Sequence, residues 1–140
     1  MAGHPRGDRG SLAVELAIIM PLLLLLLALV YAYGRVAQAN GTLEAGTRDG
    51  ARAASQARSG DDAQVAAERA VRDSLGPGAT RCLDTLQVQL RQPQLQAGFP
   101  VTVRSTCVYP LADLGLPGVP GDVRISSSFT SPVDPNRGVR

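Results

Sequence analysis

The chain has 140 residues, a formal net charge of +2 and 44% hydrophobic residues. This length allows one small domain in addition to an N-terminal targeting or membrane segment. The charge is small and mixed in sign, and no basic patch is interleaved with aromatic residues, so nucleic-acid binding is not expected. The single histidine, His4, is far in sequence from the two cysteines, Cys82 and Cys107, so no metal site is predicted.

The most apolar part of the chain lies near its N-terminus, where no charged residue occurs from Leu16 to Gly34. As a helix this segment would be roughly 28 Å long, close to the ~30 Å hydrocarbon core of a bilayer. Glu15 directly precedes it, and a carboxylate near the membrane boundary costs less than the roughly 3 kcal/mol expected at the centre. The sequence therefore predicts a membrane-spanning helix in contact with lipid. Pro21 removes one backbone hydrogen bond from that helix and predicts either a functional kink or a harmless bend.

The residues beside the apolar segment set its expected orientation. Arg6 and Arg9 precede it and Arg35 follows it, so the arginine asymmetry is weak. When the segment before a membrane helix is this short, it usually stays in the cytoplasm while the C-terminal domain crosses the membrane. We therefore expect a single-pass protein of the cytoplasmic membrane with an extracytoplasmic C-terminal domain.

The apolar segment also allows two other interpretations. The sequence Ala37-Gln38-Ala39 before Asn40 matches an A-x-A signal-peptidase site, which would give a secreted protein cleaved after Ala39. Against this, the apolar run exceeds the usual 7–15 residues of a signal peptide, and Glu15 is out of place at its start. The other alternative is a bitopic membrane protein that is never processed.

The stretch GSLAVE, residues 10–15, resembles the processing site of type IV prepilins, in which a membrane peptidase cuts after the glycine. The similarity continues through residues 8–17, Pro21 and the small-residue segment at 45–52. Together these residues resemble the TadE-like family of tight-adherence (Tad) pilus proteins. The resemblance covers roughly residues 9–54.

This resemblance implies a minor pilin or pseudopilin that acts in pilus assembly or adhesion. It implies cleavage by prepilin peptidase between Gly10 and Ser11, and it implies other pilins and Tad pilus assembly proteins as partners. In pilins the glutamate at the position of Glu15 is thought to neutralise the N-terminal ammonium of a neighbouring subunit. A carboxylate one turn from the new helix N-terminus is also stabilised by the helix dipole.

The helix is predicted to continue out of the membrane to residue 58. Small and apolar residues recur in it at three- and four-residue spacing: Ala39, Leu43, Gly46, Gly50 and Ala54. This stripe allows close approach of a helix from another protein, or packing on the protein's own sheet.

A second helix is predicted after the break at residues 59–62. Asp61 as N-cap and Gln64 would form a capping box, and the helix would run to about Leu75. Gly76-Pro77-Gly78 would end it.

From Cys82 onward the hydrophobic period changes to two, which predicts strands. Three sets of alternating residues would face a core: Leu86, Val88 and Leu90; Val101, Val103, Ser105 and Cys107; Val123, Ile125, Ser127 and Phe129. A Gly/Pro-rich connection at 110–121 separates the last two sets. Residues 131–140 are expected to form a flexible tail.

Cys82 and Cys107 share the parity of the apolar residues in their predicted strands, so both thiols would point toward the core. If this domain is exported, a disulfide between the two strands is expected. Closing a loop of this length would stabilise the fold by about 3.5 kcal/mol in the chain-entropy model. Two free buried cysteines are the alternative.

The expected fold class is α+β, with a long N-terminal transmembrane helix, a second short helix and a small antiparallel sheet of about three strands, as in pilins. The expected organisation is a cleaved leader (1–10), the membrane helix and its extension (11–58), a small ectodomain (59–130) and the tail (131–140). No nucleotide-binding motif occurs, so no cofactor is expected. No histidine would remain after leader removal to serve as a base, so catalysis is not expected.

Overall fold

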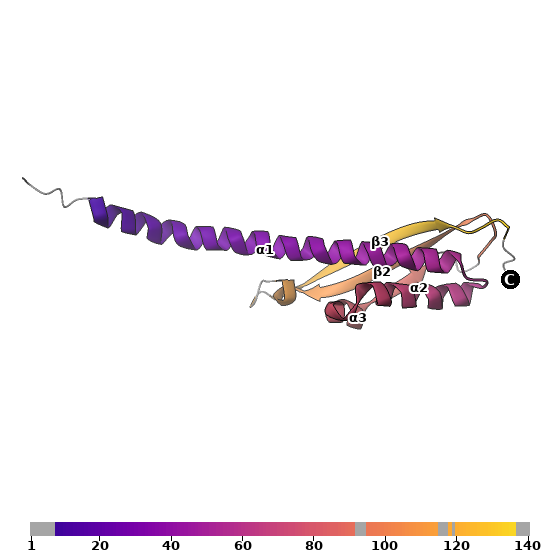
Figure 1. The fold of residues 1–140 in the computed structure, drawn as a ribbon. Helices are drawn as coiled ribbons and strands as arrows, with labels where there is room; N and C mark the ends of the chain where they lie inside the picture. Colours follow the sequence, from indigo (N-terminus) through magenta and orange to yellow (C-terminus); the bar gives the residue numbers. More distant parts are fainter. Residues whose placement is uncertain (1–7, 92–94, 115–117, 119, 137–140) are drawn as a thin grey trace, which may run out of the picture.

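The computed structural model describes residues 8–91, 95–114, 118 and 120–136. A helical hairpin packs on a three-stranded antiparallel sheet, and one of its helices extends far beyond the other elements (Figure 1). In chain order the elements are α1 (Asp8–Ser55), α2 (Gly60–Leu75), η1 (Pro77–Ala79), α3 (Thr80–Thr85), β1 (Gln87–Leu90), β2 (Pro100–Pro110), η2 (Leu111–Leu114) and β3 (Asp122–Pro132). The predicted α+β class with a small antiparallel sheet is confirmed.

Helix α1 is continuous over 48 residues, which corresponds to about 72 Å. Pro21 lies inside it, and the backbone is helical on both sides of the proline. The other elements lie only along the C-terminal part of α1, so its N-terminal part projects alone (Figure 1). The helix ends at Ser55, three residues before the predicted end.

Small residues on α1 allow α2 to pack closely against it. A Cβ atom on Gly46 would lie 3.4 Å from the Val71 carbonyl oxygen, and one on Gly50 would lie 2.7 Å from the Val71 Cγ2 atom. The sequence left open whether this stripe meets another protein or the protein's own sheet. The two glycines contact neither of these but the second helix of the same chain.

The ends of α2 are fixed by local hydrogen bonds. Ser59 is the N-cap, and its Oγ accepts a hydrogen bond of 3.1 Å from the Asp62 backbone N–H. The predicted capping box of Asp61 and Gln64 is therefore wrong, because the serine two residues earlier reaches the first free N–H groups. Gly76 has a φ of 65° at the C-cap, which agrees with the predicted stop at this glycine.

Gln64 connects α2 to the edge of the sheet instead. Its Nε2 donates a hydrogen bond of 2.8 Å to the Val88 carbonyl oxygen, and its Oε1 accepts one of 3.2 Å from the Leu90 N–H. One side-chain amide thus pairs with two β1 backbone groups that do not face β2. This covers an edge that would otherwise be open to another strand.

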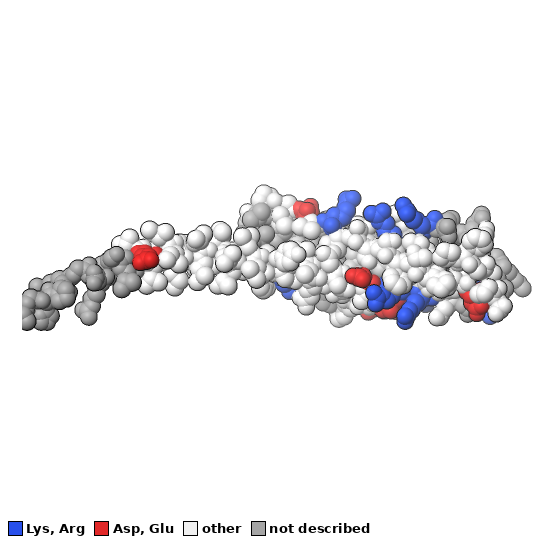
Figure 2. All heavy atoms as spheres, turned by 90° about the horizontal axis from the view of Figure 1, so that it is seen from above, with Lys and Arg blue, Asp and Glu red and all other residues white. Residues whose placement is uncertain are grey.

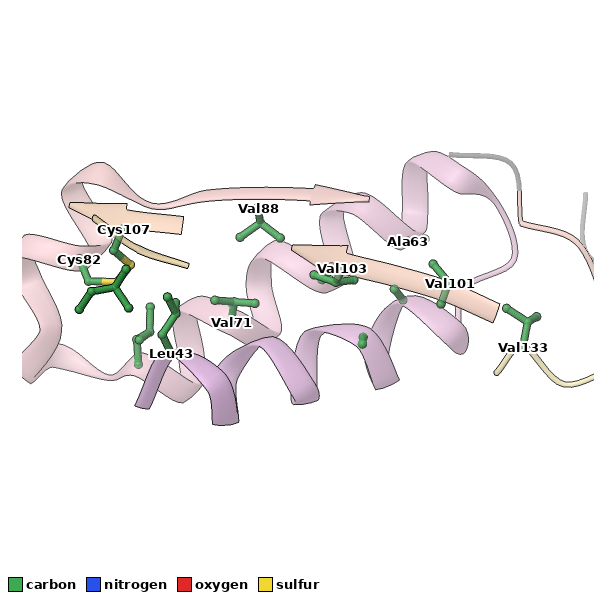
Figure 3. Close-up of a cluster of buried hydrophobic side chains, with 14 residues drawn as sticks. Leu43, Ala63, Val71, Cys82, Val88, Val101, Val103, Cys107 and Val133 are labelled. Atoms are coloured by element: carbon green, nitrogen blue, oxygen red, sulfur yellow. A yellow bond between two sulfur atoms is a disulfide. The ribbon is translucent and has the colours of Figure 1, made fainter. Parts of the chain in front are cut away.

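The strand order is β1-β2-β3, with β2 in the centre. Val103 on β2 pairs with Leu90 on β1 and with Phe129 on β3. The inward-facing residues of β2 predicted from the alternation are all buried: Val101, Val103, Ser105 and Cys107. Val101, Val103 and Cys107 pack with residues of the helical hairpin, among them Leu43 and Val71 (Figure 3).

The prediction that Cys82 begins a strand is wrong, since this residue lies on the short helix α3. Thr85 at the end of α3 occupies the position of a further strand residue. Its Oγ1 accepts a hydrogen bond of 3.0 Å from the Val108 N–H and donates one of 3.1 Å to the Val108 carbonyl oxygen. One hydroxyl therefore hydrogen-bonds the Val108 backbone groups that a longer β1 would otherwise pair. This is why β1 can be short.

The prediction of a flexible tail from residue 131 is wrong at its start. Strand β3 continues to Pro132, and Val133 is only 2% exposed. The Val133 N–H also donates a hydrogen bond of 3.2 Å to the Phe99 carbonyl oxygen. The valine is the reason for the extension, because its side chain is buried in the core. Residues 137–140 lie outside the described part of the chain.

Candidate functional site

The projecting half of α1 has an apolar surface that no other described element covers. Its large apolar side chains between Val14 and Tyr33 are 47–78% exposed. Figure 2 shows this part of the helix without basic residues and with acidic colour only near its N-terminal end. A helix this long and apolar fits a membrane anchor, because water would make such exposure costly.

Glu15 lies at the N-terminal end of this apolar surface. Its side chain is exposed, and neither ion pair among the described side chains involves it. Those pairs are Arg48–Glu44 and Arg81–Asp113, both outside the apolar segment. The described side chains of this chain therefore give the carboxylate no charged partner.

Gly10 and Ser11 lie in the first turn of α1, which begins at Asp8. Their side chains, and residues 1–7 of the predicted leader, lie outside the described part. A peptidase that binds an extended backbone would have to unwind this turn. Unwinding is inexpensive there because helix ends fray and because glycine adopts extended conformations readily.

The predicted disulfide is present between Cys82 and Cys107, whose Cα atoms are 5.0 Å apart. Both residues are fully buried. The pairing of the two cysteines was predicted correctly. The bond joins α3 to β2, however, whereas Cys82 was expected on a strand. Its position at the start of the sheet ties the helical connection after α2 to the central strand.

A groove at the base of the domain was not predicted from the sequence. It has a volume of about 470 Å³ and lies between α1, α3 and the end of β2, with Arg35, Arg81, Tyr109 and Asp113 in its lining. Burial raises the pKa of the Tyr109 phenol above its usual 10.0, although the positive charge of Arg35 acts in the opposite direction. The only feature of the sequence that could have pointed to this groove is the position of Arg35 directly after the apolar run.

These features define a class of protein in which one N-terminal apolar helix carries a small disulfide-bonded α+β domain. Residues 10–52 match the family described as TadE-like protein, which confirms the resemblance noted in the sequence. The chain is thus similar to TadE-like proteins over this region. No curated protein and no solved structure matches the chain.

The matched region lies entirely within α1. It begins at Gly10 and contains Ser11, Glu15 and Pro21, so it includes the predicted processing site, the acidic residue and the proline of the apolar segment. It also contains Gly46 and Gly50, which contact α2. The second helix and the sheet lie outside the match.

Proposed function

We propose that this protein is a membrane-anchored minor pilin or pseudopilin of a Tad-type pilus, cut by prepilin peptidase between Gly10 and Ser11. The observation that carries the proposal is the match to TadE-like proteins, which starts at Gly10 and continues through the apolar half of α1. The role is in pilus assembly or adhesion, together with other pilins and Tad assembly proteins. A structural role of this kind requires no catalytic group.

The chemistry of the cleaved end gives Glu15 its role. Cleavage after Gly10 creates a free ammonium group on Ser11, about one helical turn from Glu15. An ionised carboxylate is costly in a low-dielectric environment unless it is paired. The resemblance to pilins supplies the partner in this proposal, the ammonium of a neighbouring subunit, and neither ion pair among the described side chains of this chain involves Glu15. Pro21 would ease local unwinding of α1 as the subunit leaves the membrane for a filament.

The disulfide supports the proposed orientation. Disulfides persist in oxidising compartments such as the periplasm and are rare in the cytosol. The bond between Cys82 and Cys107 therefore favours a small domain outside the cytoplasmic membrane, with the short basic N-terminal segment inside. This agrees with access of prepilin peptidase to Gly10 from the cytoplasmic side.

The structure argues against cleavage after Ala39, the secreted-protein alternative. Ala39 lies within the continuous helix α1, is partly buried, and lines the groove at the base of the domain. Peptidase binding would require α1 to unwind at a point where it packs on the rest of the protein.

Mass spectrometry of the mature N-terminus from the native host tests the processing step. The proposal expects a chain that begins at Ser11. A chain that begins at Asn40 would establish the secreted protein, and an intact Met1 would establish the unprocessed bitopic protein. Replacing Gly10 with a bulky residue should block the cut only in the first case.

Glu15→Ala tests the charge pairing. We expect cleavage to remain and incorporation into filaments to fall, as measured by the ratio of the protein in sheared pili to that in membranes. The matched control is Glu44→Ala, which removes an exposed carboxylate on α1 outside the apolar segment. Normal incorporation of the Glu15 variant would contradict the assigned role.

A further inference from the structure

The groove at the base of the domain lies at the level where α1 leaves the membrane. The apolar run ends at Gly34, and Arg35 and Gln38 line the groove in the next turn. The headgroup layer on each side of the hydrocarbon core is roughly 5–7 Å thick, which corresponds to about four helical residues. If residues 16–34 span the hydrocarbon core, the groove therefore opens into the headgroup layer.

Contacts of the folded domain support this placement. Ala32, in the last turn of the apolar run, is only 7% exposed, whereas the large side chains around it are exposed. Leu114 at the end of η2 lines the groove and is 3% exposed, and η2 contacts α1. The domain thus reaches down to the end of the membrane-spanning part instead of standing away from it.

The charges in the groove favour an anion. Its lining carries two arginines and one carboxylate, and Asp113 pairs with Arg81 at 2.9 Å. Arg35 takes part in neither ion pair of the described side chains, so its guanidinium is available. The Tyr109 phenol, whose pKa is raised by burial above its usual 10.0, is protonated at neutral pH and able to donate a hydrogen bond. The groove volume of about 470 Å³ lies within the usual range for ligand sites.

From these observations we propose that this groove binds the phosphate of a phospholipid headgroup, with Arg35 and the Tyr109 hydroxyl as donors. This rests on the proposed membrane anchoring of α1, but it adds a specific lipid contact. The contact would fix the tilt and rotation of the small domain on the membrane surface before assembly. Binding a phosphate there also neutralises a guanidinium that no described carboxylate pairs with.

Native mass spectrometry of the full-length protein tests this, with phosphatidylglycerol added to delipidated protein in an uncharged detergent. We expect one lipid molecule to bind. Arg35→Gln should weaken binding about tenfold, the effect of losing one charge-assisted hydrogen bond. Tyr109→Phe should weaken it about fivefold, the effect of losing one neutral hydrogen bond. The matched control, Arg52→Gln, removes an exposed arginine of α1 that does not line the groove and should have no effect.

Three results would overturn the lipid site. The first is equal binding of phosphatidylglycerol by the Arg35→Gln and Arg52→Gln variants. The second is binding of diacylglycerol, which has no phosphate, to the same extent as phosphatidylglycerol. The third is displacement of the lipid by millimolar inorganic phosphate. The last would indicate a site for soluble phosphate.

Flotation of the same proteins with vesicles separates this inference from the proposed function. Loss of flotation by the unmodified protein would refute membrane anchoring itself, whereas normal flotation of Arg35→Gln with lost lipid binding would support the groove.

Discussion

The two halves of α1 have the same backbone structure and opposite surroundings. In the N-terminal half, the large apolar side chains, Leu26 among them, are 47–78% exposed on all sides of the helix. In the C-terminal half, small residues form one buried face, and Leu43 is only 1% exposed. Large apolar side chains all round the first half suit lipid, whereas glycine and alanine on one face of the second half let α2 approach. The two halves of α1 therefore differ in the size of their side chains and not in their helix propensity. Large side chains mark the exposed half, and small side chains mark the half that packs on the domain.

The largest expected effect comes from removing the disulfide, which acts only on the compact half. The double variant Cys82→Ala/Cys107→Ala should lose about 3.5 kcal/mol of domain stability, because the bond closes a loop with a sequence separation of 25. Urea unfolding, with protease resistance as the readout, measures this loss of stability. The apolar half of α1 should stay helical in detergent throughout. An unchanged urea midpoint would contradict this assignment.

A pair of identical substitutions compares the two halves directly. Leu43→Ala should destabilise the domain by about 3 kcal/mol, since it leaves a cavity in the core. Leu26→Ala should leave domain stability unchanged, because its side chain lies on the uncovered surface. Urea midpoints of both variants in the same detergent give the comparison. Similar losses would mean that the first half also packs against protein.

Glycines give a second matched pair of somewhat smaller effect. Gly50→Ala should cost about 2 kcal/mol, because its Cβ would lie 2.7 Å from Val71 Cγ2 and 3.2 Å from the Ala67 carbonyl oxygen. Gly41→Ala meets nothing within 4 Å and should stabilise the helix by up to about 1 kcal/mol. Thermal unfolding of the two variants should shift in opposite directions. A stabilised Gly50 variant would show that α1 and α2 can separate without cost.

The smallest effect is expected at the boundary between the halves, where Tyr109 and Arg35 line the same groove. The folded-state pKa of Tyr109 is raised above its unfolded value of about 10, so the folded state holds this proton more tightly. Its contribution to stability is therefore complete below pH 10 and is lost as the pH rises through the folded pKa. Tyr109→Phe should reduce the fall in urea midpoint between neutral and strongly alkaline pH. An identical fall in both proteins would contradict the assignment of a raised pKa to the partly buried phenol.

Patterns that depend on near neighbours in the sequence were predicted well. The apolar run from Leu16 to Gly34 predicted the projecting helix, and the alternation around Val103 predicted a strand, although its central place in the sheet was not predicted. The cysteine pairing was also predicted, because both residues shared a face with apolar neighbours. The short helix α3 was missed, since a helix of six residues, fewer than two turns, is too short to show a period of 3.6. The buried end at Val133 was missed because a single valine beyond a proline carries no pattern.

The sequence by itself determined that this protein has one long apolar helix with an acid at its start, a short polar break and a small sheet, because each follows from the order and spacing of adjacent side chains. Only the tertiary structure decided that Gly50 meets Val71, that Gln64 covers the edge of β1, and that Arg35 and Tyr109 line one groove. These contacts join residues from about 20 to more than 70 positions apart. No local periodicity encodes such pairs, since they depend on how the hairpin and the sheet pack together.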